Sequence, residues 1–182
     1  GRVIGLDLSR RMLHQATQET APFADRLTYI WQDARNLPFP DEVFDAVTCL
    51  EALEFTPDPP HVLAELVRVL RPGGVLLTTN RIGRDAKLMP GRAFPRDKFR
   101  QLLASLPLED ISIRTWQMEY DQAWAVKSGT PRGGGIRSLP EILRCPTCAG
   151  RIERASDTFR CTKCQRAFPI AEDDVIEMAR HI

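Results

Sequence analysis

Four cysteines near the end of the chain form the pattern with the clearest chemistry. They occur as two C-x-x-C pairs separated by twelve residues: Cys145, Cys148, Cys161 and Cys164. Four thiolates at this spacing can surround one Zn²⁺ tetrahedrally, because each pair turns so that both sulfurs face the metal. Four protein ligands leave no open coordination position, so the pattern predicts a structural zinc site. A pair of redox dithiols is the alternative, which the spacing disfavours.

Two aspartates each follow a predicted strand and could bind a nucleoside. Asp7 ends an apolar run that begins at Gly1, and Asp33 follows the run Leu27–Trp31. Short apolar runs of this kind are typical of buried strands in a parallel sheet. A carboxylate at the carboxyl end of such a strand can accept hydrogen bonds from ribose hydroxyls. A helix cap or a loop acid is the alternative for each aspartate.

Strands and helices alternate along the part of the chain that precedes the cysteines. Strands are predicted at 1–8, 27–31, 44–50 and 75–79, with helices after Ser9, after Asp58 and at 99–106, the second ended by Arg71-Pro72-Gly73-Gly74. This alternation predicts an α/β fold whose parallel sheet is covered by helices. The segments 109–120 and 122–127 are predicted to add an antiparallel edge hairpin.

A glycine-rich stretch divides the chain. Residues 128–135 read SGTPRGGG, a composition that favours a flexible tether over a packed element. We therefore predict a first domain at 1–128, a linker at 129–138 and a small domain at 139–182. The small domain has few apolar residues, so metal binding would supply its folding free energy.

Composition and charge restrict the class of protein. With 182 residues, 43% hydrophobic residues and a net charge of +1, the chain is neither disordered nor a polyanion-coating protein. We expect no membrane span and no signal peptide, hence a cytoplasmic protein. Between residues 81 and 100 seven basic residues accompany two acidic ones, a local charge of +5. This segment is either a solvated surface or a lid over an anionic substrate.

Three blocks of the first domain carry a family resemblance. They are GRVIGLDLSRRMLHQA, WQDARNLPFPDEVFDAVTCLEALEF and HVLAELVRVLRPGGVLLTT. Together they resemble class I S-adenosylmethionine-dependent methyltransferases, above all the ubiquinone and menaquinone biosynthesis branch, over about residues 1–127. The resemblance implies a Rossmann-like parallel sheet and an S-adenosylmethionine site that contains Asp7, Leu8, Met12, Asp33, Ala34 and Cys49. In this family the first aspartate binds the ribose, the second binds the adenine amino group, and the following amide meets a ring nitrogen.

The loop after FDAVTCL should border both cofactor and acceptor, because ligands of open α/β sheets lie beyond the carboxyl ends of the strands. Family members often carry a histidine pair where Glu54 and Phe55 stand. Glu51 and Glu54 are therefore candidate general bases, and a structural role is the alternative for each. We expect Cys49 to be a small buried hydrophobe, since no histidine pairs with it locally. Methyl transfer depends mainly on positioning, so no catalytic triad is required.

The family's glycine-rich E/DxGxGxG loop should lie about twenty residues before Asp7, where it approaches the cofactor closely. Nothing precedes Gly1 in this sequence. We therefore expect an N-terminally truncated fragment that lacks the first strand of its sheet. Such a chain should bind S-adenosylmethionine poorly and should be inactive as given.

The tail has a second resemblance. EILRCPTC, FRC and FPI are similar to the small zinc-ribbon activator subunits of tRNA, rRNA and protein methyltransferases. The resemblance implies that the ribbon docks on its own methyltransferase domain, and the covalent linker would make that docking intramolecular.

Three hypotheses for the function remain. The first is methyl transfer to a small or lipid-like acceptor, with the ribbon stabilising the core or presenting substrate; an RNA or protein methyltransferase is a variant of it. The second is a non-catalytic RNA- or protein-binding module built from a degenerate methyltransferase core and a zinc ribbon. The third, a nucleotide-dependent oxidoreductase, is disfavoured by the Asp33-Ala34 block and the ribbon.

Overall fold

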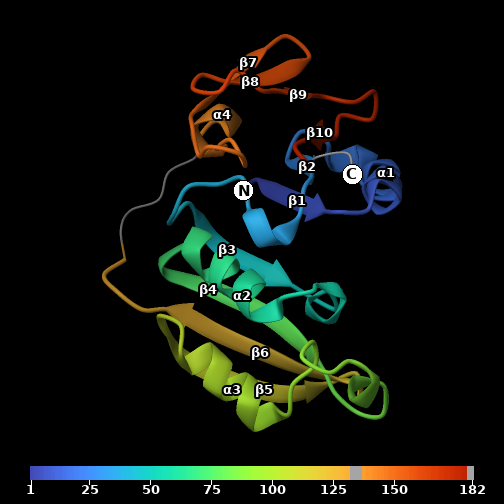
Figure 1. Cartoon of the computed structure of the whole chain (residues 1–182), viewed down its shortest axis with the longest axis vertical. Helices are drawn as coiled ribbons and strands as arrows, with labels where there is room; N and C mark the ends of the chain where they lie inside the picture. Colours follow the sequence, from blue (N-terminus) through green and yellow to red (C-terminus); the bar gives the residue numbers. More distant parts are fainter. Residues whose placement is uncertain (132–136, 180–182) are drawn as a thin grey trace. The chain divides into compact units, whose positions relative to one another are not determined.

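A computed structural model describes residues 1–131 and 137–179 of the chain (Figure 1). Their contacts define two compact units, Gly1–Pro40 with Gly135–Ile182 and Asp41–Gly134. The predicted linker at 129–138 includes residues 132–136, which lie outside the described part. The division at this linker remains a prediction, because the contacts group the first forty residues with the tail.

The first unit contains a three-stranded parallel sheet in the order β1-β2-β10. Its strands are β1 (Val3–Asp7), β2 (Leu27–Trp31) and β10 (Ile176–Glu177), and its helical segments are α1 (Arg10–Glu19), η1 (Ala21–Phe23) and η2 (Ala34–Asn36). Ser9 caps α1 by accepting a hydrogen bond from the Met12 amide, as the sequence predicts. Leu13 on α1 and Ile30 on β2 are buried and form part of the core.

The tail of the first unit forms a ribbon. A short helix, α4 (Leu139–Ile142), precedes the antiparallel strands β7 (Ile152–Ala155), β8 (Thr158–Cys161) and β9 (Ala167–Pro169). The β7–β8 hairpin agrees with the predicted one. Ile152, Phe159 and Phe168 are buried, so the ribbon has a small apolar core of its own.

The end of the ribbon pairs with β2, which the sequence did not predict. Strand β10 runs parallel to β2, with Ile176 opposite Ile30 and Glu177 opposite Trp31. The amides of Met178 and Ala179 then donate to the Trp31 carbonyl at 3.0 and 2.8 Å. This is strand addition to the free edge of a sheet, so main-chain hydrogen bonds join the ribbon to the first forty residues.

Ion pairs support the same contact. The Arg10 guanidinium lies 3.1 Å from Asp173 and 3.3 Å from Glu177, and His14 Nδ1 lies 3.1 Å from Asp173. Helix α1 thereby contacts the ribbon next to the paired strands. Asp173 is largely buried, with 15% of its side chain exposed. These ion pairs therefore contribute more to stability than they would on an open surface.

The second unit is a four-stranded sheet in the order β3-β4-β6-β5. Its strands are β3 (Phe44–Cys49), β4 (Leu70–Arg81), β5 (Leu108–Trp116) and β6 (Tyr120–Lys127), and its helical segments are η3 (Leu53–Phe55), α2 (Pro59–Val69), η4 (Asp85–Leu88) and α3 (Arg96–Ala104). Strands β3 and β4 are parallel, and β5 and β6 form the antiparallel edge hairpin that the sequence predicts. The α/β class with a Rossmann-like parallel sheet is therefore confirmed, although the parallel strands belong to two separate sheets.

Two predicted boundaries need correction. Helix α2 ends at Val69, and the segment Leu70–Gly74 already belongs to β4 rather than to a turn. A Cβ atom on Gly74 would lie 2.9 Å from the Asp45 carbonyl oxygen, so glycine lets β3 and β4 approach here. The turn of the hairpin lies at 117–119, so Tyr120 begins β6 instead of ending the previous strand. Among the described residues, none of the helices has the length and apolar character needed to cross a bilayer.

We predict that Asp173→Asn weakens the first unit in a pH-dependent way. Burial favours a higher pKa for Asp173, but the hydrogen bonds from Arg10 and His14 prevail and lower it. Its folded-state pKa is thus below the unfolded value, so its contribution is complete above the unfolded pKa and is lost as the pH falls through the folded pKa. At pH 7 the substitution should lower the free energy of unfolding by about 1–2 kcal/mol. The deficit should shrink as the pH falls below the unfolded-state pKa of about 3.9 towards the lower folded-state pKa.

Thermal unfolding followed between pH 7 and pH 3 measures this difference. The matched control is Asp174→Asn, the neighbouring exposed acid, which has a positive φ of 60° that asparagine tolerates. Equal effects of the two substitutions would contradict the role assigned to Asp173.

Candidate functional site

Asp7 and Asp33 lie at the same edge of the first unit's sheet. Asp7 is the last residue of β1 and is paired with Trp31, the last residue of β2, and Asp33 follows two residues later. The Gln32 amide donates to the Asp7 carbonyl at 3.1 Å, which extends the pairing towards Asp33. Because parallel strands place their carboxyl ends at one edge, both acids are available to one ligand there.

The two carboxylates have different surroundings. Asp7 is exposed, and its Oδ1 accepts a hydrogen bond from the Ser9 amide at 2.7 Å. Asp33 is half-buried and caps η2: its Oδ1 accepts from the Arg35 amide at 2.8 Å, and its Oδ2 pairs with the Arg35 guanidinium at 2.6 Å. The cap holds the Asp33 carboxylate and the neighbouring Ala34 amide in a defined loop conformation.

Two apolar side chains that follow Asp7 within five residues are exposed to solvent. Leu8 is 54% exposed and Met12 is 53% exposed. The Leu8 carbonyl accepts a hydrogen bond from Trp31 Nε1 at 2.8 Å, which fixes the backbone after β1. Exposed apolar residues beside an exposed carboxylate are suited to a flat, hydrogen-bonding ring system such as a nucleobase.

The remaining predicted residues belong to the second unit. Cys49 ends β3, and burial, together with the Glu54 carboxylate, raises its pKa to about 12. Such a thiol stays protonated and is a poor nucleophile, although Cys49 is half-buried rather than fully buried as expected. Glu51 is exposed and has a positive φ of 50°, and its amide donates to Thr79 Oγ1 at 2.7 Å. A non-glycine residue in this conformation after a strand is a local strain of the kind found in functional loops.

Glu54 is buried in a polar network that the sequence did not reveal. Its side chain is 1% exposed, and its Oε1 accepts a hydrogen bond from the Tyr120 hydroxyl at 2.8 Å. Arg81 donates to the same hydroxyl at 2.8 Å. Oε2 of Glu54 has no partner among the described residues. The antiparallel pairing of Arg81 with Tyr120 creates this cluster, and no local sequence pattern could have indicated it.

Tyr120 is a hydrogen-bond donor in this network. Burial and the Glu54 carboxylate raise its pKa, against the opposing effect of Arg81. The hydroxyl therefore stays protonated at neutral pH and stabilises the buried carboxylate of Glu54. In this conformation Glu54 anchors the loop after β3, whereas Glu51 is the exposed acid of that loop.

The four cysteines of the ribbon come together as predicted. Their sulfur atoms all lie within 4.8 Å of one another, with Cys145 and Cys164 3.6 Å apart and Cys148 and Cys161 3.5 Å apart. Four ligands at the Zn–S bond length of about 2.3 Å in a tetrahedron require sulfur separations of about 3.8 Å, so the arrangement fits zinc. A Cβ atom on Gly150 would lie 2.9 Å from the Cys161 sulfur, so glycine is needed in this tight turn.

Backbone amides face the same cluster. Those of Lys163 and Cys164 each lie 3.4 Å from the Cys161 sulfur. Although burial opposes it, these amide hydrogen bonds lower the pKa of Cys161 to about 6. Amides directed at the sulfurs favour thiolates, the form that binds a metal.

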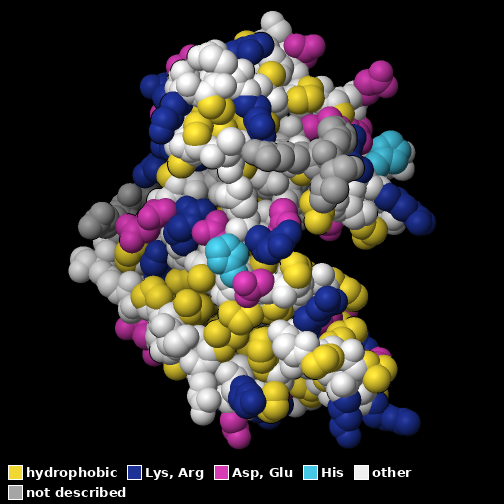
Figure 2. All heavy atoms as spheres, viewed as in Figure 1, with side chains coloured by type: hydrophobic (Ala, Val, Ile, Leu, Met, Phe, Trp, Pro, Cys, Tyr) yellow, Lys and Arg dark blue, Asp and Glu magenta, His cyan; other side chains and the backbone are white. Residues whose placement is uncertain are grey.

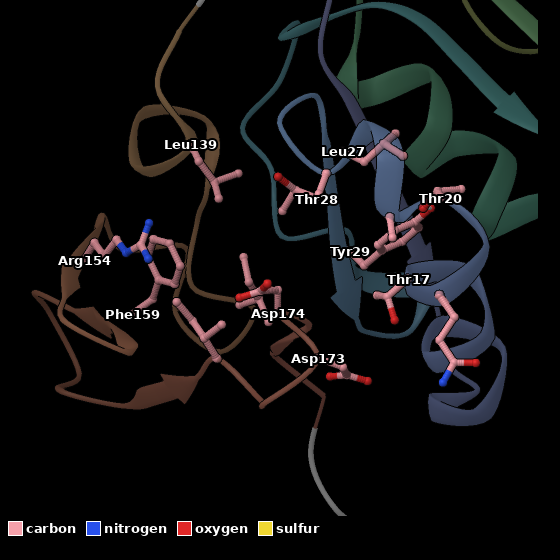
Figure 3. A pocket seen from close by; sticks show the side chains of 15 residues that line it. Thr17, Thr20, Leu27, Thr28, Tyr29, Leu139, Arg154, Phe159, Asp173 and Asp174 are labelled. Carbon is pink, nitrogen blue, oxygen red and sulfur yellow. Dashed lines mark hydrogen bonds between the residues drawn. The ribbon is translucent and has the colours of Figure 1, made fainter.

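A pocket of about 460 Å³ opens in the first unit between the α1–β2 segment and the ribbon (Figure 3). Thr20 and Tyr29 line one side, and their hydroxyl groups are 2.9 Å apart. Phe159 and Asp173 line the ribbon side. The pocket contacts the start of β2, whereas Asp33 follows its end, so this cavity belongs to the ribbon contact and not to the edge that carries the aspartates.

Known proteins similar to this chain include methyltransferases. Residues 1–78 match the family model described as "Methyltransferase domain". A phthiotriol/phenolphthiotriol dimycocerosates methyltransferase of Mycobacterium ulcerans is 37% identical over 141 residues, 77% of this chain and 48% of the relative. A 2-phytyl-1,4-naphtoquinone methyltransferase of Synechococcus elongatus is 47% identical over 75 residues, 40% of this chain and 32% of the relative. The chain spans less than half the length of these curated relatives.

Solved structures show the same fold. A complex between the Haloferax volcanii Trm112 methyltransferase activator and a candidate methyltransferase matches with a TM-score of 0.58 and 22% identity, covering 71% of this chain and 73% of that chain. An S-adenosylmethionine-dependent methyltransferase from Aquifex aeolicus matches with a TM-score of 0.57 and 17% identity, covering 70% of this chain and 69% of that chain. Residues 1–78 are therefore similar to the methyltransferase-domain family, and the chain shares the fold of these solved structures.

We predict that Tyr120→Phe destabilises the second unit. The substitution removes the donor to Glu54 and leaves a buried carboxylate without a partner, which should lower the free energy of unfolding by about 2 kcal/mol. Urea unfolding measures the change. Adding Glu54→Leu to Tyr120→Phe should recover part of the loss, since it removes the uncompensated charge.

The chain offers a matched control. Tyr29, its other tyrosine, makes a part-buried hydroxyl–hydroxyl hydrogen bond to Thr20. Tyr29→Phe should lower the free energy of unfolding by about 0.5 kcal/mol, because neither partner is charged. If the two Tyr→Phe variants unfolded alike, the network around Glu54 would not have the stabilising role described.

Proposed function

We propose that the protein is an S-adenosylmethionine-dependent methyltransferase that acts on a lipid-like or quinone-like acceptor. The observation that carries the proposal is the placement of Asp7 and Asp33 at one edge of the sheet, within the segment that matches the methyltransferase-domain family. The acceptor class follows the relatives, which are named for phthiotriol dimycocerosates and for a phytyl naphthoquinone.

The residues of the first unit would hold the nucleoside of the cofactor. Asp7 keeps one oxygen on the Ser9 amide and would accept hydrogen bonds from the ribose hydroxyls with the other. Asp33 would accept from the adenine amino group while it caps η2, because each carboxylate oxygen has two lone pairs. The Ala34 amide would donate to a ring nitrogen, and Leu8 and Met12 would cover the ring.

The loop after β3 would border the acceptor. When bound, the cofactor supplies an electrophilic methyl group: the acceptor's electron pair forms the new bond to the methyl carbon, the carbon–sulfur bond breaks towards sulfur, and the acceptor loses a proton. The chain's part is to exclude water, position the acceptor and take that proton. Of the two candidate bases, Glu51 is exposed and can accept a proton there, whereas Glu54 is buried and holds the loop. Cys49 would contribute an apolar wall.

Titration of the complete gene product with S-adenosylmethionine tests the proposal. Asp7→Asn should weaken the affinity about 10- to 100-fold, because a charge-assisted hydrogen bond contributes about 1.5–3 kcal/mol. Asp25→Asn is the control, since Asp25 is an exposed acid of the same unit that pairs with its neighbour Arg26. Absence of binding by the unsubstituted protein would reject the proposal, whereas equal affinities for the two variants would reject the ribose role of Asp7.

We further propose that the four cysteines hold Zn²⁺ and that the metal-bound ribbon stabilises β2. Support comes from the sulfur separations and from the pairing of β10 with β2. The Arg144 amide also donates to the Pro38 carbonyl at 2.8 Å, and Asn36 donates to the Pro146 carbonyl at 2.7 Å. Both bonds tie the segment after Asp33 to the first cysteine pair. A ribbon that serves as a built-in activator is in keeping with the activator complex among the structural neighbours.

Cys148→Ser tests the zinc proposal. The protein should bind one equivalent of zinc per chain, and the variant should lose it, as measured by elemental analysis. Hydrogen exchange should then show reduced protection of amides 27–31 as well as of the ribbon, because metal binding supplies folding free energy to β10. Cys49→Ala, the only cysteine outside the cluster, should keep the zinc and the protection. Full zinc content in Cys148→Ser would overturn the assignment.

A further inference from the structure

The two most exposed large apolar side chains of the described residues lie in the second unit. Leu88, the last residue of η4, is 81% exposed, and Met118, in the β5–β6 turn, is 87% exposed. Single exposed apolar residues are common on protein surfaces, so each alone would need no explanation. Two such residues in neighbouring loops, however, require an explanation.

Arg81 connects the two loops. Its Nη2 lies 2.9 Å from Asp85 in η4 and 2.8 Å from Glu119 in the turn, and the Ile82 amide donates to the Glu119 carbonyl at 2.8 Å. Leu88 is one 3₁₀ turn after Asp85, and Met118 directly precedes Glu119. The β4–α3 loop and the β5–β6 turn therefore form one end of the sheet, and Figure 1 shows them together there. We call this end the apolar–basic tip: residues 84–92 and 117–118.

Met118 lies in a turn whose backbone conformation is unfavourable for a methionine. Gln117 and Met118 have φ values of 50° and 56°, the left-handed region. Turn positions in this region favour glycine, asparagine or aspartate, because other side chains are strained there. A methionine that is both strained and exposed contributes nothing to the folded chain alone, so a contact outside the chain is the better explanation for it.

The charge of the tip is positive. Arg84, Lys87 and Arg92 are exposed, and within the described part of the chain no carboxylate lies at ion-pair distance from them. The nearby acids, Asp85 and Glu119, are both paired with Arg81. Within the tip, three basic residues against one acid, Asp85, give +2. Figure 2 shows basic and apolar side chains next to one another over this end of the unit.

We propose that the apolar–basic tip docks on an anionic lipid surface. Leucine and methionine enter the apolar boundary of a bilayer, and basic residues around them are attracted to anionic headgroups. The exposed apolar residues are aliphatic, whereas single-stranded RNA is bound on aromatic faces. This inference rests on the proposed function for its biological sense, because a lipid-like acceptor resides in the bilayer and must be taken from it.

Vesicle co-sedimentation of the full chain without S-adenosylmethionine tests the proposal. The protein should bind vesicles that contain equal parts phosphatidylcholine and phosphatidylglycerol, and bind phosphatidylcholine vesicles at least tenfold less. The double variant Leu88→Ser with Met118→Asn should reduce binding at least tenfold. Its fold should be retained, because asparagine tolerates the left-handed conformation at position 118.

Two lysines provide a matched charge control. Lys87→Glu at the tip should reduce binding about tenfold or more, since each basic residue near an anionic surface contributes about 1 kcal/mol. Lys98→Glu makes the same charge change on α3, outside the tip, and should have little effect. Phe23→Ser removes an exposed apolar residue of the first unit and should also have little effect.

The outcomes separate this proposal from its rivals. Equal binding to both kinds of vesicle, or equal effects of the two lysine variants, would overturn it. Loss of binding in inorganic phosphate at matched ionic strength would indicate a phosphate site and would also overturn it, as would binding of a single-stranded RNA to the tip in place of vesicles. Vesicle binding is measured without the cofactor, so a failure here leaves the methyltransferase proposal intact, and a failure to bind S-adenosylmethionine leaves this one intact.

Discussion

Strand β2 is hydrogen-bonded along both of its edges, and the organisation of the first unit depends on this double pairing. Strand β1 pairs with one edge and β10 with the other. An unpaired edge would leave amide and carbonyl groups open to other chains. The Trp31 carbonyl, which ends β2, instead accepts two amides from the residues after β10. Because Asp33 follows β2 directly, the position of this candidate ligand depends on a segment from the far end of the sequence.

The ribbon is stabilised from two directions. The close sulfur atoms of its cysteines suit a metal at one end, and its apolar residues form a core at the other. Val175, Ile176 and Met178 are buried where β10 joins the sheet of the first unit. The small apolar core of the ribbon is therefore extended by the buried residues around β10, which pairs with β2. This explains why residues so distant in sequence form one compact unit.

Local sequence patterns predicted the strands and the cysteine cluster, but they did not predict the pairings between distant segments. The apolar runs indicated β1 and β2, and the cysteine spacing indicated the metal cluster, because each is set within a few residues. Strand β10 has two residues, too few for a period, and its pairing is decided by the edge that β2 leaves free. The Tyr120–Glu54 hydrogen bond depends on the register between β4 and β6. A sequence cannot specify that register locally, so the burial of Glu54 was not predictable.

The basic segment at 81–100 shows why a count of charges is a poor guide to function. Arg81 and Arg96 are neutralised by structure: Arg81 bridges Asp85 and Glu119, and Arg96 is bound by the buried Asp121. Among residues 1–131 and 137–179, exposed cations such as Lys87 have no carboxylate at ion-pair distance and are available to a partner outside the chain. The sequence alone does not distinguish a solvated surface from a contact with an anion for any of the seven basic residues. The structure separates the paired cations from the exposed ones. The exposed cations of the apolar–basic tip lie beside the exposed apolar residues Leu88 and Met118. An anionic lipid surface can bind both features, because it has charged headgroups and an apolar boundary.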